Sequence, residues 1–157
     1  MRDIKFRGKA DIERLNEFNE FNQFGIPHQN GWVYGAYVHN GGVNPYIISH
    51  DVAESCEEYF SPEWWCPVDP KTVGQFTGLK DKNGREIYEG DIVRGFIGKK
   101  ISYEIVYSTD ACFYGQSLPY NNLPQGGRQT VGLNNISDWA EIIGNVHDNP
   151  ELLEVSL

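Results

Sequence analysis

Histidines and carboxylates are the side chains in this sequence that could bind a metal or transfer protons. His28, His39 and His50 recur at intervals of eleven residues, a spacing that matches no set of metal ligands on one helix or one hairpin. His147 and Asp148 form a single adjacent pair, whereas a metal-dependent phosphohydrolase needs further histidines nearby. The sequence therefore predicts no metal site and no cofactor, and it favours a turn at His147 and Asp148.

The candidate nucleophiles are three cysteines, Cys56, Cys66 and Cys112, together with several serines. Neither a Gly-x-Ser-x-Gly motif nor a Gly-x-x-x-x-Gly-Lys-Ser motif occurs, so no local signature of acyl or phosphoryl chemistry is present. The odd number of cysteines and the lack of a Cys-x-x-Cys spacing argue against a disulfide framework or a zinc ribbon. We expect reduced, at least partly buried thiols and no enzymatic activity. A small hydrolase with a site between two halves of the chain stays open as a weaker alternative.

Acidic and aromatic residues alternate between Asp51 and Asp69, on a segment that we expect to be irregular. Tyr59, Trp64 and Trp65 could serve there as rigid anchors for a protein partner, because aromatic side chains dominate the energetics of many interfaces. The alternative is that Trp64 and Trp65 cover a core of their own domain. Both interpretations are open from the sequence.

The acidic charge is unevenly distributed along the chain. The net charge is -9, and no Lys or Arg occurs between Arg14 and Lys71. Such an acidic field repels phosphate and so disfavours nucleic-acid binding, although an acidic face can also serve solubility alone. If nucleic acid is the ligand, the site is expected at the basic residues of the second half, which are Lys80, Lys82, Arg85, Arg94, Lys99 and Lys100.

The strongest structural signal lies in residues 73–93. Asn83 and Gly84 stand between two runs that contain apolar residues, and both tolerate the positive φ that a two-residue hairpin turn needs. The pattern predicts a turn at 81–84 between strands at 76–80 and 85–88. Gly90 and Asp91 predict a second turn before a strand at 91–97.

Short strands are expected throughout the first half of the chain. Alternating apolar residues predict strands at 1–9, 31–39 and 46–48, the last two forming a hairpin. Between them, apolar residues at intervals of three predict a short amphipathic helix inserted at about residues 10–24. We expect its apolar stripe to pack on its own domain.

The second half is similarly divided. The pattern predicts a turn at 98–100, strands at 101–107, 111–116 and 138–146, and a long polar loop at 117–131. Several short strands at close spacing resemble an SH3-like small barrel over residues 85–148. We therefore predict a mainly β protein with minor α content. An N-terminal region of antiparallel strands and one inserted helix covers residues 1–84, and a small barrel with a C-terminal tail covers residues 85–157.

One long motif stands out within this pattern, Val-Gly-Gln-Phe-Thr-Gly-Leu-Lys-Asp-Lys-Asn-Gly-Arg-Glu-Ile-Tyr-Glu-Gly-Asp-Ile-Val at residues 73–93. Together with the residues at 1–9, 31–35, 46–48, 68–72 and 142–153, it resembles the YopX family of small proteins encoded by bacteriophages and prophages. Residues 10–30 form an insertion relative to many members, so the resemblance does not cover them.

The resemblance implies a phage or prophage accessory protein and supplies no catalytic residues. With the absence of catalytic motifs, it favours a non-enzymatic binding module that acts on a host or phage protein or on a second copy of itself, with nucleic-acid binding as the alternative. The N-terminus lacks the apolar stretch of a signal peptide, and no run of eighteen apolar residues occurs. We therefore expect no membrane association and a location in the cytoplasm of the bacterial host.

Overall fold

The computed structural model describes residues 4–16, 25–39, 41, 45–97, 99–118 and 130–153. The chain forms two compact units, Met1–Gln75 and Phe76–Leu157. The division falls within one strand, whereas the sequence pattern placed it between Gly84 and Arg85. Within the described residues the protein is mainly β with two short α-helices, which confirms the predicted fold class.

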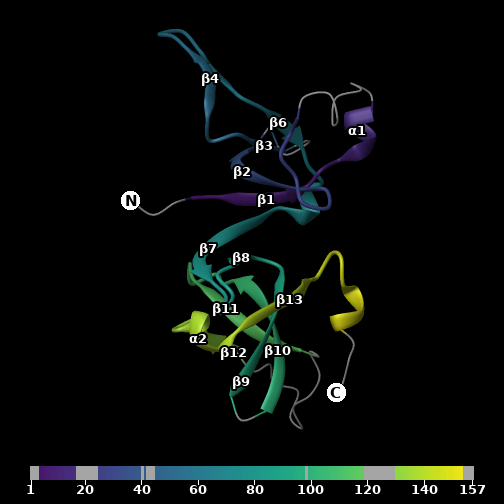
Figure 1. Ribbon diagram of the computed structural model, residues 1–157, viewed down its shortest axis with the longest axis vertical. Coiled ribbons are helices and arrows are strands. Elements are labelled where there is room, and N and C mark those ends of the chain that lie inside the picture. The colour runs from purple at the N-terminus through teal and green to yellow at the C-terminus, as the bar shows by residue number, and fades with distance from the viewer. Residues whose placement is uncertain are drawn as a thin grey trace. The chain divides into compact units, whose positions relative to one another are not determined.

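The first unit is built on an antiparallel sheet (Figure 1). Its neighbouring strands run in the order β6, β3, β2, β1 and the start of β7. The elements from the N-terminus are β1 (Phe6–Lys9), α1 (Ile12–Asn16), β2 (Trp32–Val38), β3 (Tyr46–Ile48), β4 (Val52–Ser55), β5 (Phe60–Pro62), β6 (Trp65–Pro67), the 3-10 helix η1 (Pro70–Thr72) and β7 (Gly74–Lys80).

Apolar residues from neighbouring strands form the core of this unit. Val33, Ile47, Cys66 and Val68 are fully buried, and Ile26 joins them. The predicted hairpin of residues 31–39 and 46–48 is confirmed, because β2 and β3 pair antiparallel.

Two predictions for the first unit need correction. The segment from Asp51 to Asp69 is not irregular, since it contains β4, β5 and β6. The inserted helix is seen at Ile12–Asn16, and residues 17–24 of the prediction lie outside the described residues. Ile12 is 60% exposed, so this residue of the predicted apolar stripe lies mostly in solvent and does not pack on its own unit.

The second unit is a curled antiparallel sheet that forms a half-barrel, in agreement with the small barrel predicted for residues 85–148. Its strand order is β12, β11, β10, β9 and β13. The elements of this unit after β7 are β8 (Glu86–Tyr88), β9 (Asp91–Ile97), β10 (Lys99–Tyr107), β11 (Phe113–Leu118), β12 (Thr130–Gly132), α2 (Ile136–Trp139), β13 (Glu141–Asn145) and the 3-10 helix η2 (Pro150–Leu153).

The core of the second unit gathers Ile87, Tyr103, Ile105 and Ile136. Trp139 packs at its side, where a side chain added to Gly95 would overlap the indole ring. Glycine at position 95 therefore provides the space in which the Trp139 ring lies.

Three boundaries in the second unit differ from the sequence prediction. Residues 99 and 100 begin β10 instead of forming a turn, because β9 and β10 pair directly at Ile97 and Lys99. The predicted loop at 117–131 overlaps the end of β11 and the start of β12, and its residues 119–129 lie outside the description. Residues 138 and 139 belong to α2, so the closing strand begins only at Glu141.

Candidate functional site

Strands β4 and β5 form a two-stranded sheet of their own within the first unit. Figure 1 shows β4 extending away from the sheet strands β1 to β3 of the same unit. The Glu63 amide donates to the Asp51 carbonyl oxygen at 3.0 Å at the base of the hairpin, and the Cys56 amide donates to the Tyr59 carbonyl oxygen at 2.9 Å near its tip. The hairpin is therefore closed by hydrogen bonds at both ends.

Every residue from 51 to 60 is exposed to solvent. Three of them carry large apolar side chains, with exposed fractions of 49% for Val52, 53% for Tyr59 and 63% for Phe60. An isolated two-stranded hairpin is marginally stable in water. Because Val52, Tyr59 and Phe60 are about half exposed or more, the hairpin presents apolar surface that its own unit does not cover.

The hairpin is also strongly acidic. Its acids are all exposed, and they are Asp51, Glu54, Glu57, Glu58 and Glu63. Since no Lys or Arg occurs between Arg14 and Lys71, the sequence around the hairpin supplies no basic residue to balance these charges.

The three predicted anchor residues have different environments. Tyr59 is exposed on the hairpin. Trp65 is 45% exposed on β6, where its ring packs edge-on against the Tyr46 ring with 5.6 Å between the ring centroids. Trp64 is half-buried and packs against the core of the first unit. Neighbours on an extended backbone point to opposite faces, which explains why the two adjacent tryptophans differ.

Two further surface residues of the hairpin were not among the predicted anchors. Phe60 and Val52 are as exposed as Tyr59 or nearly so. The available signal was the pair of short apolar runs on either side of the acidic residues Glu57 and Glu58, a pattern that fits a hairpin without a glycine turn.

The basic residues of the nucleic-acid alternative are partly held in ion pairs. The Lys82 ammonium lies 2.7 Å from a Glu141 carboxylate oxygen, and this contact lowers the pKa of Glu141. Arg85 lies 2.7 Å from the Asp81 carboxylate. Lys80 is exposed and Arg94 is half-buried on β9, while the side chains of residues 99 and 100 lie outside the description.

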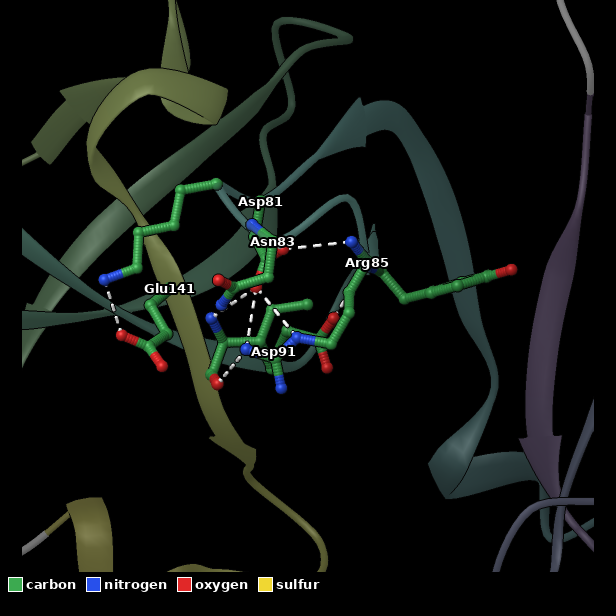
Figure 2. A network of polar contacts seen from close by, with 8 residues as sticks. Asp81, Asn83, Arg85, Asp91 and Glu141 are labelled. Atoms are coloured by element: carbon green, nitrogen blue, oxygen red, sulfur yellow. Dashed lines mark hydrogen bonds and ion pairs between the residues drawn. The ribbon is translucent and has the colours of Figure 1, made fainter.

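Asp81 is the centre of the polar network in Figure 2. The residue Asp81 is 2% exposed. Its carboxylate accepts three hydrogen bonds of 2.9 Å, from the Asn83 amide, the Arg85 amide and the Arg85 Nε. It also accepts from the Ile142 amide on β13 at 3.1 Å, and Arg85 Nη2 donates to the Ile142 carbonyl oxygen at 2.6 Å. The network ties the β7–β8 turn to the closing strand.

The same network sets the ionisation of Asp81. Burial favours the neutral acid, but the hydrogen bonds from Ile142, Arg85 and Asn83 outweigh it and hold the pKa of Asp81 below its ordinary value. At neutral pH the Asp81 carboxylate is therefore charged, and its role is to hold the β7–β8 turn against β13 through these hydrogen bonds.

The candidate metal ligands and nucleophiles lie apart from one another in the described residues. They contain no group of three or more His, Cys, Asp or Glu side chains that could hold a metal ion. Burial raises the pKa of the Cys66 thiol to about 12, with a further contribution from Asp11, so this thiol is a weak nucleophile at neutral pH. Cys56 and Cys112 are exposed, which corrects the expectation of at least partly buried thiols.

The His147 and Asp148 pair forms part of a turn, as predicted. The Asn145 side-chain oxygen accepts hydrogen bonds from the His147 amide at 3.0 Å and from the Asp148 amide at 2.9 Å.

In the part of the chain that the structure describes, no helix has the length and apolar character needed to cross a membrane.

A family model described as YopX protein matches residues 29–154. The chain belongs to the YopX family. The match includes the acidic hairpin and the Asp81 turn, and it omits nearly all of the insertion at residues 10–30. Both structural features therefore lie in the part of the chain that the family model covers.

The fold of this YopX family member is also similar to a solved structure. The crystal structure of protein EF1440 from Enterococcus faecalis aligns with a TM-score of 0.54 at 24% sequence identity, over 98% of this chain and 100% of that chain. At this identity the likeness concerns the fold alone. No match was found among curated proteins.

Proposed function

We propose that this YopX family member is a phage or prophage accessory protein that acts in the bacterial cytoplasm as a non-enzymatic binding module for a protein partner. The observation that carries the proposal is the β4–β5 hairpin, whose residues 51–60 are all exposed and include Val52, Tyr59 and Phe60. Clustered apolar side chains in an acidic setting are typical of a surface that is covered in a complex.

The physical argument rests on what the hairpin does not do for its own unit. Its apolar side chains are mostly in water, so their contribution to the hydrophobic stabilisation of the fold is small. Aromatic side chains on such a surface can instead lose their water contact when a partner covers them. Binding to a protein partner is therefore the function that these exposed side chains support best.

Nucleic-acid binding is the less supported candidate. It would depend on lysines and arginines that release counterions from phosphate, and Lys82 and Arg85 already contact the carboxylates of Glu141 and Asp81. The net charge of -9 opposes the approach of a polyanion.

The test is capture of proteins from a nuclease-treated host-cell lysate by the immobilised chain, with wild type compared with Phe60→Ser. A matched control is Ile12→Ser, which removes an equally exposed apolar side chain from a different element. We expect a stoichiometric protein with wild type and Ile12→Ser, and at least a strong reduction with Phe60→Ser. Equal capture by wild type and both variants contradicts the proposal. A parallel capture from untreated lysate that recovers nucleic acid alone also contradicts it.

A further inference from the structure

The two strands of the hairpin pair with an irregular register. Val52 lies opposite Pro62, Glu54 opposite Ser61 and Ser55 opposite Phe60, with a register shift between Val52 and Glu54. One residue of β4, Ala53, is therefore left without its own partner across the ladder, as in a β-bulge.

The bulge determines which side chains share a face. Residues directly opposite each other in an antiparallel pair lie on the same face, and successive residues of a strand alternate. Phe60 and Pro62 thus share one face with Val52, while Glu54 and Ser61 lie on the other. Without the bulge, Val52 and Glu54 would lie on the same face.

Val52 therefore joins the apolar residues of β5 on one face, although β4 itself does not alternate regularly. Val52 and Phe60 are 49% and 63% exposed on the apolar face. Exposed acidic residues lie at the tip of the hairpin, at Glu57 and Glu58, and at its base, at Asp51 and Glu63. The occupant of this face must match an apolar centre and an acidic rim.

A second copy of this chain is a poor occupant of the face. Each copy carries a net charge of -9, so two copies repel each other over the distance that ordinary salt leaves unscreened. Charge complementarity instead favours a partner with clustered basic side chains.

We propose that the apolar face of the β4–β5 hairpin docks into an apolar recess of a different protein, at which Lys and Arg side chains on the rim pair with the hairpin carboxylates. This inference rests on the proposed function and specifies its partner. The recess takes up Phe60 and Val52, and the rim pairs with Glu57 and Glu58 at the tip and with Glu63 at the base of the hairpin. Because charges on the rim act mainly on the association rate, binding weakens as salt is raised.

The first test uses the exposed cysteine at the tip of the hairpin. A benzophenone maleimide on Cys56, in the Cys112→Ser variant, is irradiated in a nuclease-treated host-cell lysate. The matched control carries the same label on Cys112 in the Cys56→Ser variant. Cys66 stays unlabelled at neutral pH because it is buried and its thiol pKa is raised to about 12.

The second test compares two variants with equal total charge. One is Glu57→Lys with Glu58→Lys and Glu63→Lys on the hairpin; the other is Asp110→Lys with Asp138→Lys and Glu151→Lys, three exposed acids of the second unit. Capture of the cross-linked protein is then measured for both over a series of salt concentrations. The pair separates the local charge of the hairpin from the charge of the whole molecule.

We expect cross-links from Cys56 to peptides that combine apolar residues with Lys or Arg, and a loss of about tenfold or more in capture with the hairpin variant alone. Cross-links confined to Cys112, equal capture by both charge variants, or cross-linking of a second copy of this chain overturns the inference while leaving a protein partner in place. If wild type captures no protein even at low salt, the proposed function itself fails and the inference falls with it.

Discussion

At the scale of single residues, Asp81 is the clearest determinant of stability in the second unit. Its buried carboxylate accepts hydrogen bonds from two residues of its own turn and from Ile142, 61 positions further along the chain. Hydrogen bonds to a buried charged group each contribute more than neutral ones. A change at this residue therefore affects local and long-range structure together.

We predict that Asp81→Asn lowers the free energy of unfolding by about 2 to 3 kcal/mol, because an amide cannot satisfy all the donors that point at the carboxylate. Urea denaturation followed by circular dichroism measures the change. The matched control is Lys82→Met, which breaks an ion pair with both side chains 45% exposed and should cost less than about 0.5 kcal/mol. Equal losses for the two variants would contradict the role given to Asp81.

The pH dependence follows from the direction of the Asp81 shift. The folded-state pKa lies below the unfolded value of about 4, so the charged carboxylate stabilises the fold fully above that pH. The contribution is lost as pH falls through the lower folded-state pKa. The stability difference between wild type and Asp81→Asn should therefore shrink below about pH 4, and a difference that is constant with pH would argue against the assignment.

The adjacent tryptophans give a second prediction at this scale. Trp64→Ala should destabilise the first unit by about 2 kcal/mol, because its ring packs against the core. Trp65→Ala should cost less than about 1 kcal/mol, since Trp65 is 45% exposed and contacts mainly Tyr46. Thermal unfolding of the two variants side by side checks the order, and a larger loss for Trp65→Ala would contradict it.

At the scale of elements, the β4–β5 hairpin can be separated from its unit. Asp51 and Glu63 are already joined by a backbone hydrogen bond at its base, so residues 52–62 can be replaced by Asn-Gly, a sequence that suits a two-residue turn. We predict a midpoint of thermal unfolding within a few degrees of wild type, because residues 52–60 are exposed, together with loss of partner capture. A shortened protein that fails to fold would show that the hairpin stabilises its unit.

The sequence predicted some elements well and missed others for identifiable reasons. The β7–β8 hairpin was predicted from Asn83 and Gly84, but only Gly84 has a positive φ. Asp81 supplies the remaining constraint by accepting the amides of Asn83 and Arg85. A local pattern could locate this turn, whereas the contact with Ile142 depends on tertiary structure.

The β4–β5 hairpin was missed because its sequence follows no regular strand pattern. The bulge interrupts the alternation of β4, and the connection through Cys56, Glu57 and Glu58 contains no Gly or Asn. Composition predicted Tyr59, Trp64 and Trp65 as anchors. Tyr59 and Trp65 are exposed, whereas the partial burial of Trp64 depends on the course of the backbone. Which face Phe60 and Val52 share follows only from the register.

At the scale of the whole molecule, net charge gives a prediction that separates the two candidate classes of ligand, protein and nucleic acid. We predict no retardation of duplex DNA or single-stranded RNA by the chain even at low salt, because its net charge is -9 and phosphate binding depends on unpaired basic side chains. Gel retardation checks this with Glu141→Gln, which frees Lys82, as a comparison. Binding by wild type that weakens steeply with salt would move the site to the basic residues of the second unit.

The two units also differ in a way that optical spectroscopy can use. Three of the four tryptophans, Trp32, Trp64 and Trp65, lie in the first unit, and Trp139 lies in the second. Since Trp139 packs into the space left by Gly95, its emission should shift to the red when the half-barrel opens. Replacing Trp139 with Phe confines indole fluorescence to the first unit. The difference between wild type and this variant then reports on the second unit, so the opening of each unit can be timed separately.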